Sequence, residues 1–316
     1  MARKIVVFGS LNRDVVLRVP HLPIEGETVL GGAIDDYFGG KGSNQAVAAA
    51  RLGAEVALIG RVGNDATGKE MIDTLARENI DVTGIEIDRE TPTGVALIMV
   101  DAEGRNIIAV SPGANGVVGE LEVERLRTAL EEDDVLVVQL EIPALAAKSA
   151  LKTAFRIGAR VILNATPVDD STFELLDGVD FVVVNAREAA TLFKRRVESA
   201  STAGKVAADV QRYGRAGTVI VTLGAAGAVL RSSDTAIDVP GFKVESVDSV
   251  GAGDAFVGGL AASLLRGDSI EDVIRFGCAA GAVATTRYGA QPSLPALQEL
   301  DGLLNGGGRT TGLELV

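Results

Sequence analysis

Short apolar runs alternate with amphipathic or alanine-rich segments along most of the chain. A first buried strand is predicted at residues 4–9. Runs that are hydrophobic on both faces predict further buried strands at 56–60, 135–140, 161–164, 181–184 and 218–222. Strands of this kind belong to a parallel sheet with helices on both faces. Helical patterns separate most of them, at residues 42–52, 68–78, 120–131, 144–157, 186–194, 203–213, 253–266, 270–286 and 295–304. The pattern therefore predicts an α/β fold with a mainly parallel central sheet.

Two segments, at about residues 12–34 and 92–112, interrupt this α/β rhythm. Short apolar runs at 15–19, 95–100 and 106–110 predict strands in them, and a turn at 101–104 joins the last two as a hairpin. We expect a small antiparallel sheet that stands off the main body and serves as a lid. No linker rich in Pro, Gly or Ser divides the chain, so residues 1–316 are predicted to form a single domain.

Composition narrows the classes of function. The 316 residues carry a formal net charge of −13, which argues against nucleic acid and anionic membranes as partners. The lone cysteine, Cys278, allows no intrachain disulfide, and the lone histidine, His21, lies in a proline-flanked loop, so a zinc site or a Ser-His-Asp triad is not expected. No signal-peptide pattern and no apolar run of membrane-spanning length is present, which predicts a cytoplasmic protein.

The most informative stretch runs from Asp248 to Asp254 and precedes a predicted helix. Three small residues, Gly251, Ala252 and Gly253, leave their backbone N–H groups uncovered at the helix N-terminus, where an anion binds favourably. Asp254 is a poor neighbour for a resting phosphate but suits a base that takes a proton during phosphoryl transfer. An Asp that merely caps a buried helix remains the alternative.

Two other phosphate-binding patterns are excluded. A dinucleotide fingerprint that begins at Gly251 needs a third glycine where Phe256 stands. A P-loop that begins at Gly63 needs Ser or Thr where Glu70 stands, and a carboxylate there repels phosphate.

Further polar residues follow the predicted strands, at the edge of the sheet where ligands bind. A glycine-rich run at 39–45 opens a helix, although such a run with a solvated lysine also has a purely structural interpretation. Asn12 and Asp14 share one face and suit neighbouring hydroxyls, although an Asx-turn is the simpler explanation when they are taken alone. The other candidates at strand ends are Glu141, Asn185, Glu188, Thr222, Gly224 and Gly227.

Taken together, these segments resemble the ribokinase-like (pfkB) carbohydrate kinase family over nearly the whole chain. Residues 39–53 resemble the first signature of that family, and Asp248–Phe256 resembles the second. Residues 93–98, 113–115 and 289–293 resemble the branch that acts on ribose. The resemblance implies a three-layer fold with a small β-sheet lid and transfer of the γ-phosphoryl group of ATP to O5 of D-ribose.

The resemblance also implies roles for individual residues. Asp254 would activate the sugar hydroxyl, and the N–H groups of Gly251, Ala252 and Gly253 would form the anion hole. The sugar would be held by Asn12, Asp14, Gly40, Lys41, Asn44 and Glu141. Asn185 and Glu188 would organise Mg²⁺ and phosphate, and ATP would contact Thr222, Gly224, Gly227 and Gly253. A K⁺ ion would be bound by Asp248, Val250, Ala284, Arg287, Gly289 and Ser293. The lid would also form the interface of a homodimer.

Three alternatives remain open from the sequence. Another kinase of this family, acting on deoxyribose, a ketohexose or a nucleoside, is the nearest of them. A non-catalytic sugar- or nucleotide-binding regulator is disfavoured by the intact corner at Asp254, and a dehydrogenase by Phe256. Cys278 lies in the helix that borders the adenine in the family, which bears on nucleotide preference.

Overall fold

The computed structural model describes residues 3–306. Within this range, the central sheet has ten strands. Nine of them lie in the order β14-β13-β12-β11-β10-β9-β1-β4-β5, and the tenth, β6, pairs with β4. The parallel strands are β1 (Ile5–Phe8), β4 (Val56–Gly63), β5 (Ile80–Asp81), β6 (Ile85–Asp88), β9 (Val135–Gln139), β10 (Arg160–Asn164), β11 (Phe181–Asn185) and β12 (Thr218–Thr222). Two antiparallel strands, β13 (Ala228–Ser232) and β14 (Ala236–Val239), complete one edge.

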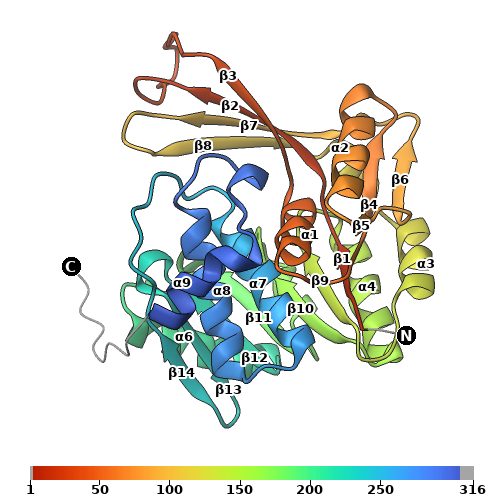
Figure 1. The fold of residues 1–316 in the computed structure, drawn as a ribbon, viewed down its shortest axis with the longest axis vertical. Helices are drawn as coiled ribbons and strands as arrows, with labels where there is room; N and C mark the ends of the chain where they lie inside the picture. The colour runs from red at the N-terminus through yellow and green to blue at the C-terminus, as the bar shows by residue number, and fades with distance from the viewer. Residues whose placement is uncertain (1–2, 307–316) are drawn as a thin grey trace.

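Helices cover both faces of this sheet and give three layers (Figure 1). One face is packed by α1 (Lys41–Arg51), α2 (Ala66–Arg77), α7 (Ala252–Arg266), α8 (Ile270–Ala284) and α9 (Leu297–Gly306). The other face is packed by α3 (Glu120–Ala129), α4 (Ala144–Ile157), α5 (Ala186–Phe193) and α6 (Ala200–Gly214). Side chains of β1 alternate between the two cores, since Ile5 and Val7 join the first and Val6 and Phe8 the second. The predicted α/β fold is confirmed.

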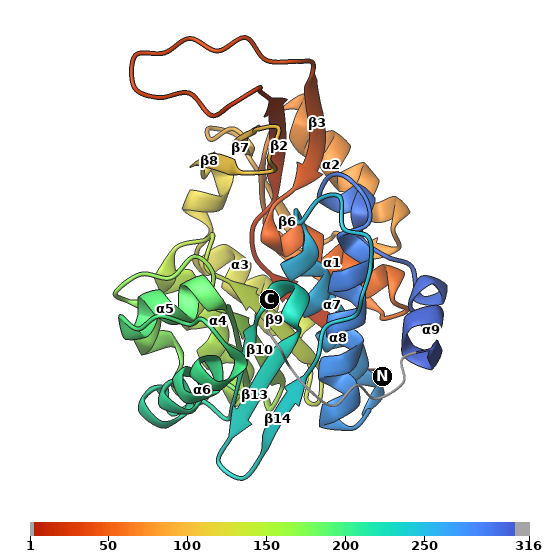
Figure 2. The same cartoon turned by 90° about the vertical axis from the view of Figure 1, so that its left-hand side faces the viewer.

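A separate sheet of four strands stands above the main body (Figures 1 and 2), in the order β3-β2-β7-β8. Its strands are β2 (Asn12–Arg18), β3 (Ile34–Gly39), β7 (Gly94–Val100) and β8 (Asn106–Ser111). Both hairpins are antiparallel as expected, but the central pair, β2 with β7, is parallel, so the sheet is mixed. The segment that enters it also continues beyond residue 34 as β3, which the sequence did not reveal because two adjacent aspartates interrupt its apolar residues.

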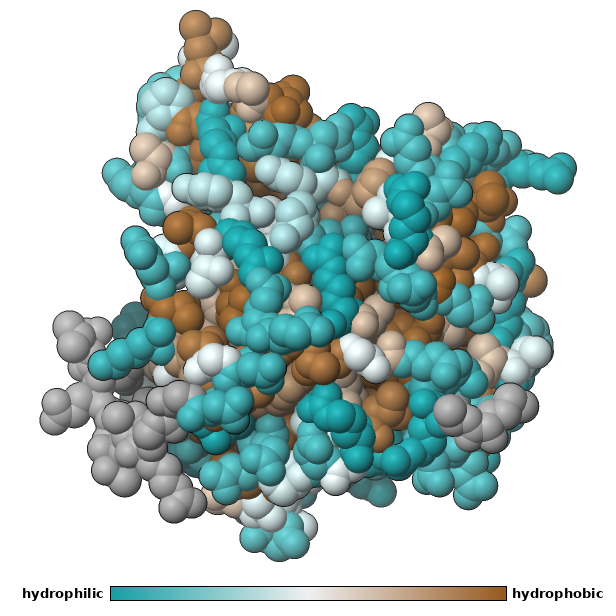
Figure 3. All heavy atoms as spheres, in the orientation of Figure 1, coloured by the Kyte–Doolittle hydropathy of each residue, from teal (hydrophilic) through white to brown (hydrophobic). Residues whose placement is uncertain are grey.

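One face of this lid sheet carries a small apolar cluster of Val16, Ala96 and Ile98. The opposite face leaves large hydrophobic side chains in solvent, and Figure 3 shows hydrophobic residues at the surface of the lid.

No helix within residues 3–306 is long and apolar enough to cross a membrane. Short 3-10 helices lie at Gly113–Val117, Thr172–Leu175, Gly224–Ala226 and Gln291–Ser293.

Candidate active site

The carboxyl ends of the parallel strands face the N-termini of α1 and α7, and two cavities lie between them. The larger has a volume of about 470 Å³ and the smaller of about 230 Å³. Thr222, Ser249 and Gly253 line both cavities, so the two are adjacent. Asp254 and Lys41 belong to the smaller one. This is the edge of the sheet at which the sequence places its candidate residues.

The glycine corner at 251–254 begins α7, but two of its N–H groups are unpaired and not the three that were predicted. Gly251 is the N-cap of α7 with φ 78°, a left-handed conformation that favours glycine. Among the described residues, the N–H groups of Gly251 and Gly253 have no partner, whereas that of Ala252 makes a long bond of 3.3 Å to the carbonyl oxygen of Ser249. A Cβ built on Gly253 would meet no atom within 4 Å. Gly251 lines the smaller cavity and Gly253 lines both, so two unpaired donors lie at the cavity wall.

Asp254 does not cap α7, so the capping hypothesis is wrong. It stands in the first turn of the helix, and its carboxylate accepts from two side-chain amides of α1. Asn44 Nδ2 donates to Oδ2 and Gln45 Nε2 donates to Oδ1, each at 2.9 Å. Asp254 is 8% exposed and lines the smaller cavity. Burial raises the pKa of Asp254, while the ammonium of Lys41 and the two amide donors oppose that rise.

The residues predicted to hold the sugar lie together around Glu141. The Glu141 carboxylate accepts from the hydroxyl of Ser10 at 2.6 Å and from the backbone N–H of Lys41 at 3.2 Å. Asn12 Nδ2 approaches the same carboxylate at 3.5 Å. Gly40 adopts φ 90°, and a Cβ there would come within 2.6 Å of the backbone nitrogen of Asn12. The close approach of the two backbones therefore requires glycine.

Asp14 faces this cluster from the lid. Its side chain is 7% exposed, and no described residue donates a hydrogen bond to its carboxylate. Burial, together with the charges of Glu141 and Asp254, raises the pKa of Asp14 to about 7. A Cβ at Gly39 would overlap this carboxylate, so only glycine leaves room for it.

Lys41 lies among these acidic groups. Burial on its own would lower the pKa of its ammonium, but the carboxylates of Asp254, Glu141 and Glu188 outweigh that effect and raise the pKa. The side chain is therefore a permanent cation beside Asp254 at neutral pH.

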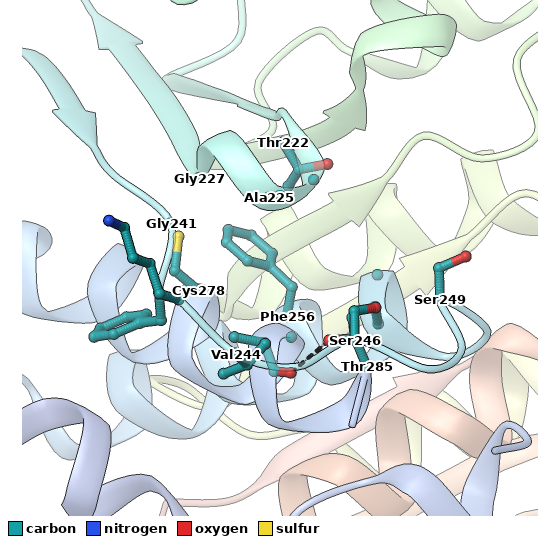
Figure 4. A pocket seen from close by; sticks show the side chains of 17 residues that line it. Thr222, Ala225, Gly227, Gly241, Val244, Ser246, Ser249, Phe256, Cys278 and Thr285 are labelled. Atoms are coloured by element: carbon teal, nitrogen blue, oxygen red, sulfur yellow. Dashed lines mark hydrogen bonds between the residues drawn. The ribbon is translucent and has the colours of Figure 1, made fainter. Parts of the chain in front are cut away.

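The larger cavity is lined by Thr222, Gly224 and Gly227, the residues predicted to contact ATP. In Figure 4, Phe256 lies between the Thr222–Gly227 segment and Val244, and Cys278 and Ser249 lie at opposite ends of the cavity. Apolar side chains such as Phe242, Val244 and Phe256 form much of its wall and suit the flat face of a base. The sequence did not identify Phe242 or Val244, because they lie on the irregular segment between β14 and α7.

Cys278 sits on α8 as expected and is buried. Burial raises the pKa of its thiol to about 12, so the group is protonated at neutral pH and a poor nucleophile. This environment is that of a structural thiol.

Asn185 and Glu188 meet at the start of α5 and line the smaller cavity. Asn185 Oδ1 accepts from the N–H of Glu188 at 2.9 Å, and Glu188 Oε2 accepts from the N–H of Asn185 at 2.8 Å, which is a capping box. One carboxylate oxygen of Glu188 remains for another partner. Among the described residues, no cluster of three or more His, Cys, Asp or Glu side chains could hold a metal ion. A Mg²⁺ ion here would keep most of its waters, as this ion prefers.

The segments predicted to bind a monovalent cation are tied together by Asp248. Its carboxylate accepts from the N–H groups of Val250 and Gly289 at 3.1 and 3.0 Å. The N–H of Asp248 donates to the carbonyl oxygen of Thr285, the residue after Ala284, at 3.1 Å. These bonds bring two backbone segments side by side, as a site built mostly from carbonyl oxygens requires.

The remaining two predicted cation ligands adjoin the same segments. The hydroxyl of Ser293 is fully buried and donates to the carbonyl oxygen of Ala290 at 2.8 Å, which leaves its oxygen lone pairs available. The guanidinium of Arg287 is positively charged, has no acceptor atom and is paired with Glu299, so only the backbone carbonyl of this residue is a candidate ligand.

Three polar residues beneath Asp254 were not singled out from the sequence. Gln45 Nε2 donates to Asn164 Oδ1 at 3.0 Å as well as to Asp254, and Gln139 Nε2 donates to Gln45 Oε1 at 2.7 Å. Gln45 lies in the glycine-rich run, and Gln139 and Asn164 end β9 and β10. The sequence did carry a signal for Gln139 and Asn164, because each is a polar residue at the end of a buried apolar strand.

Comparison with known proteins agrees with this architecture. A profile of the pfkB family carbohydrate kinases matches residues 2–297. A ribokinase from Haemophilus influenzae is 38% identical over 95% of this chain and 97% of its own length. A deoxyribokinase from Salmonella typhi is 31% identical over 95% of this chain and 98% of its own. The structure of Arabidopsis thaliana ribokinase complexed with ribose and ATP superimposes with a TM-score of 0.86 at 30% identity, and covers 96% of this chain and 99% of that one.

Proposed function

The chain belongs to the pfkB family of carbohydrate kinases, and we propose that it transfers the γ-phosphoryl group of ATP to the O5 hydroxyl of D-ribose, giving ribose 5-phosphate and ADP. The similar ribokinase of Arabidopsis was crystallised with this sugar and this nucleotide. One observation carries the proposal for this chain. The carboxylate of Asp254 is held at the wall of a polar cavity that adjoins a larger, more apolar cavity of about 470 Å³.

Asp254 is the base in this proposal. It accepts the proton of O5 as the bond from O5 to phosphorus forms and the bond from phosphorus to the β-phosphate oxygen breaks. The unpaired N–H groups of Gly251 and Gly253, at the N-terminus of α7, stabilise the negative charge that develops on the transferred group. Asn12, Asp14, Lys41, Asn44 and Glu141 orient the sugar, with the backbone of Gly40 beside them.

Two cations complete the proposed site. Asn185 and Glu188 would bind Mg²⁺ through water, and this ion would supply positive charge to the phosphates of ATP. K⁺ would bind the carbonyl-rich loops that Asp248 joins, next to the glycine corner. A Cβ at Gly251 would lie 3.2 Å from the carbonyl oxygen of Ala290 and 3.4 Å from Ser293 Oγ, so this loop directly supports the corner.

The lid is the proposed dimer interface. Ile34, Leu97 and Ile107 expose 62%, 56% and 46% of their surface on one face of it, and a second copy of the sheet would cover them. We place the enzyme in the cytoplasm, where its co-substrate ATP is made.

Deoxyribose is the alternative acceptor favoured by a specific observation, because a deoxyribokinase matches nearly the whole chain. Asp14 decides between the two sugars in our proposal, since its carboxylate has no hydrogen-bond donor within the described part of the protein. Vicinal hydroxyls of ribose would provide that donor, and a sugar that lacks the 2-hydroxyl would provide fewer donors.

A coupled assay of ADP release tests the proposal. Ribose, deoxyribose, fructose and adenosine are compared as acceptors at equal concentration, each with K⁺ or Na⁺ as the only monovalent cation. We expect the highest kcat/KM with ribose, and ³¹P NMR of the product should place the phosphate on O5. A higher kcat/KM with any other acceptor would contradict the assignment of ribose.

A further inference from the structure

The carboxylate of Asp254 rests on a chain of buried amides that the proposed reaction does not itself use. Gln45 is 1% exposed and Gln139 is fully buried, and they come from α1 and the end of β9. Gln45 makes three hydrogen bonds, in which Nε2 donates to Asp254 and Asn164 and Oε1 accepts from Gln139. Both of its amide protons and one oxygen lone pair are therefore engaged.

The orientation of the Gln45 amide is fixed by its partners. If it were rotated by half a turn, Oε1 would face two acceptor oxygens, those of Asp254 and Asn164, and Nε2 would face the nitrogen of Gln139. Asn164 cannot rotate to relieve this, because its own Nδ2 donates to the hydroxyl of Thr166 at 3.2 Å and to the carbonyl oxygen of Val183 at 3.3 Å. The chain of amides thus has one direction, with its donors aimed at the carboxylate.

This direction leaves one acceptor unsatisfied at the far end. Gln139 Oε1 is buried and has no hydrogen-bond partner among the described residues. It occupies the space beside Gly9, where any Cβ would overlap it. A buried oxygen without a partner is unfavourable for folding. A methionine of similar length would remove this unsatisfied oxygen but would leave Gln45 Oε1 without its donor, so the amide at 139 serves the orientation of Gln45.

We propose that Gln45, held in one orientation by Gln139, is a positioning residue that fixes the carboxylate of Asp254 for proton transfer. The proposal rests on the proposed role of Asp254 as the base. Asn44 binds Oδ2 and Gln45 binds Oδ1, so the plane of the carboxylate is defined by two donors. Each oxygen keeps a further lone pair, and one of these is free to accept the proton of the sugar.

The Gln45 amide also favours the charged form of Asp254, and that effect is measurable as a pH dependence. A donor to a carboxylate stabilises its ionised form and lowers its pKa. The other charged groups around Asp254 are Lys41 of α1, Glu141 after β9 and Asp14 of the lid, with Glu188 of α5 acting on Lys41. These remain in place when Gln45 is replaced, so a change in the pH profile reports the lost donor.

The test compares full-length Gln45→Met and Gln139→Met with the wild-type enzyme. Gln45→Met keeps the length of the side chain and removes the donor. We expect kcat at pH 7 to fall at least about tenfold, KM for ATP to stay within about twofold, and the acid limb of the kcat profile to move up by about one pH unit. Gln139→Met leaves the donor but frees its orientation, so the same changes should appear at smaller size.

Thr153→Val on α4 is the matched control, because it also deletes a buried hydrogen bond, from Thr153 Oγ1 to the carbonyl oxygen of Ser149 at 2.9 Å, away from Asp254. It should leave the pH profile unchanged. A wild-type kcat and acid limb in both glutamine variants would overturn the positioning role. If Gln45→Met fails to fold, Gln139→Met decides by the same criterion.

Asp254→Asn separates this inference from the proposed function. If Asp254→Asn abolishes turnover and the glutamine variants behave like the wild type, only the positioning role is wrong. If Asp254→Asn turns over at the wild-type rate, the proposed base is wrong and the positioning role falls with it.

Discussion

Replacing Asp14 by Asn should stabilise the enzyme without sugar and weaken its binding of sugar. Asp14 is buried beneath the lid, close to Glu141 and Asp254, and its carboxylate receives no hydrogen bond from the described residues. Its pKa is raised from 3.8 to about 7. A buried carboxylate without a hydrogen-bond donor lowers the stability of the folded state, and such a loss of stability is typical of ligand-binding sites.

The sign of the effect on stability follows from linkage. Because the pKa of Asp14 is raised on folding, the folded protein binds more protons than the unfolded chain between about pH 4 and pH 7. The free energy of unfolding therefore falls as the pH rises through this window. A shift of about three pH units corresponds to an upper limit of about 4 kcal/mol, and sharing of the charge with Glu141 and Asp254 reduces the expected value to about 1–4 kcal/mol.

Urea unfolding without ligands, at pH values from 4 to 8, measures this directly. The variant should gain on the wild type as the pH rises, and the gap should be widest above pH 7. Asp36→Asn, on the same lid sheet, is the control, because the hydrogen bond from Arg13 lowers the pKa of Asp36. The linkage of Asp36 therefore lies below about pH 4, and this variant should be less stable than the wild type by a nearly constant amount from pH 4 to 8. Parallel curves for Asp14→Asn and the wild type over the whole range would refute the reasoning.

The same pKa sets the pH dependence of sugar binding. If the ionised form of Asp14 accepts hydroxyl groups, the apparent KM for ribose should rise about tenfold between pH 8 and pH 6 in the wild type, because ionisation falls from about nine-tenths to one-tenth. In Asp14→Asn the KM should be higher than in the wild type at pH 8, and this pH dependence should be lost. A wild-type KM that does not change between pH 6 and pH 8 would contradict the role of Asp14 in sugar binding.

Three further predictions concern the proposed site. Asp254→Asn should lower kcat by at least about 10²–10⁴-fold while ATP still binds, as measured by ADP release and calorimetry, and near wild-type turnover would refute its role as the base. Turnover should be faster in K⁺ than in Na⁺ at equal ionic strength, and equal rates would remove the proposed cation site. Gly227→Ala should weaken ATP binding more than ribose binding, because φ is 98° there and a Cβ would overlap the carbonyl oxygen of Val239; an unchanged Kd for ATP would contradict this.

The central fold was predictable because its signals are local. Strands such as Val135–Gln139 are apolar on both faces, and the range 144–157 for α4 follows directly from its periodicity. The two-residue strand β5 and the strand β3, which two adjacent aspartates interrupt, carry no comparable pattern. The parallel pairing of β2 with β7 joins segments about 80 residues apart, and the residue pattern within each strand carries no information about the direction of its neighbour.

The site was predictable where backbone geometry demands glycine. Gly40, Gly227 and Gly251 all have positive φ, and each marks a place where the backbone meets a cavity or another backbone. The amide chain beneath Asp254 was not predictable, because Gln45 and Asn164 are 119 positions apart and meet only through packing. Neither did the sequence indicate that Asp254 would bind two amides of α1 rather than cap its own helix.

Charge is divided unequally along the cleft, and this division explains how an acidic protein can receive ATP. Asp14, Glu141, Asp254 and Glu188 gather around Lys41 at the acceptor end, where carboxylates suit the hydroxyl donors of an uncharged sugar. The residues that line the larger cavity include no Asp or Glu, and their one charged side chain is Lys243. With a net charge of −13, the field of the whole protein does not attract the nucleotide. Binding must therefore come from groups at the cavity itself, namely Lys243, the N–H donors of α7 and the proposed cations.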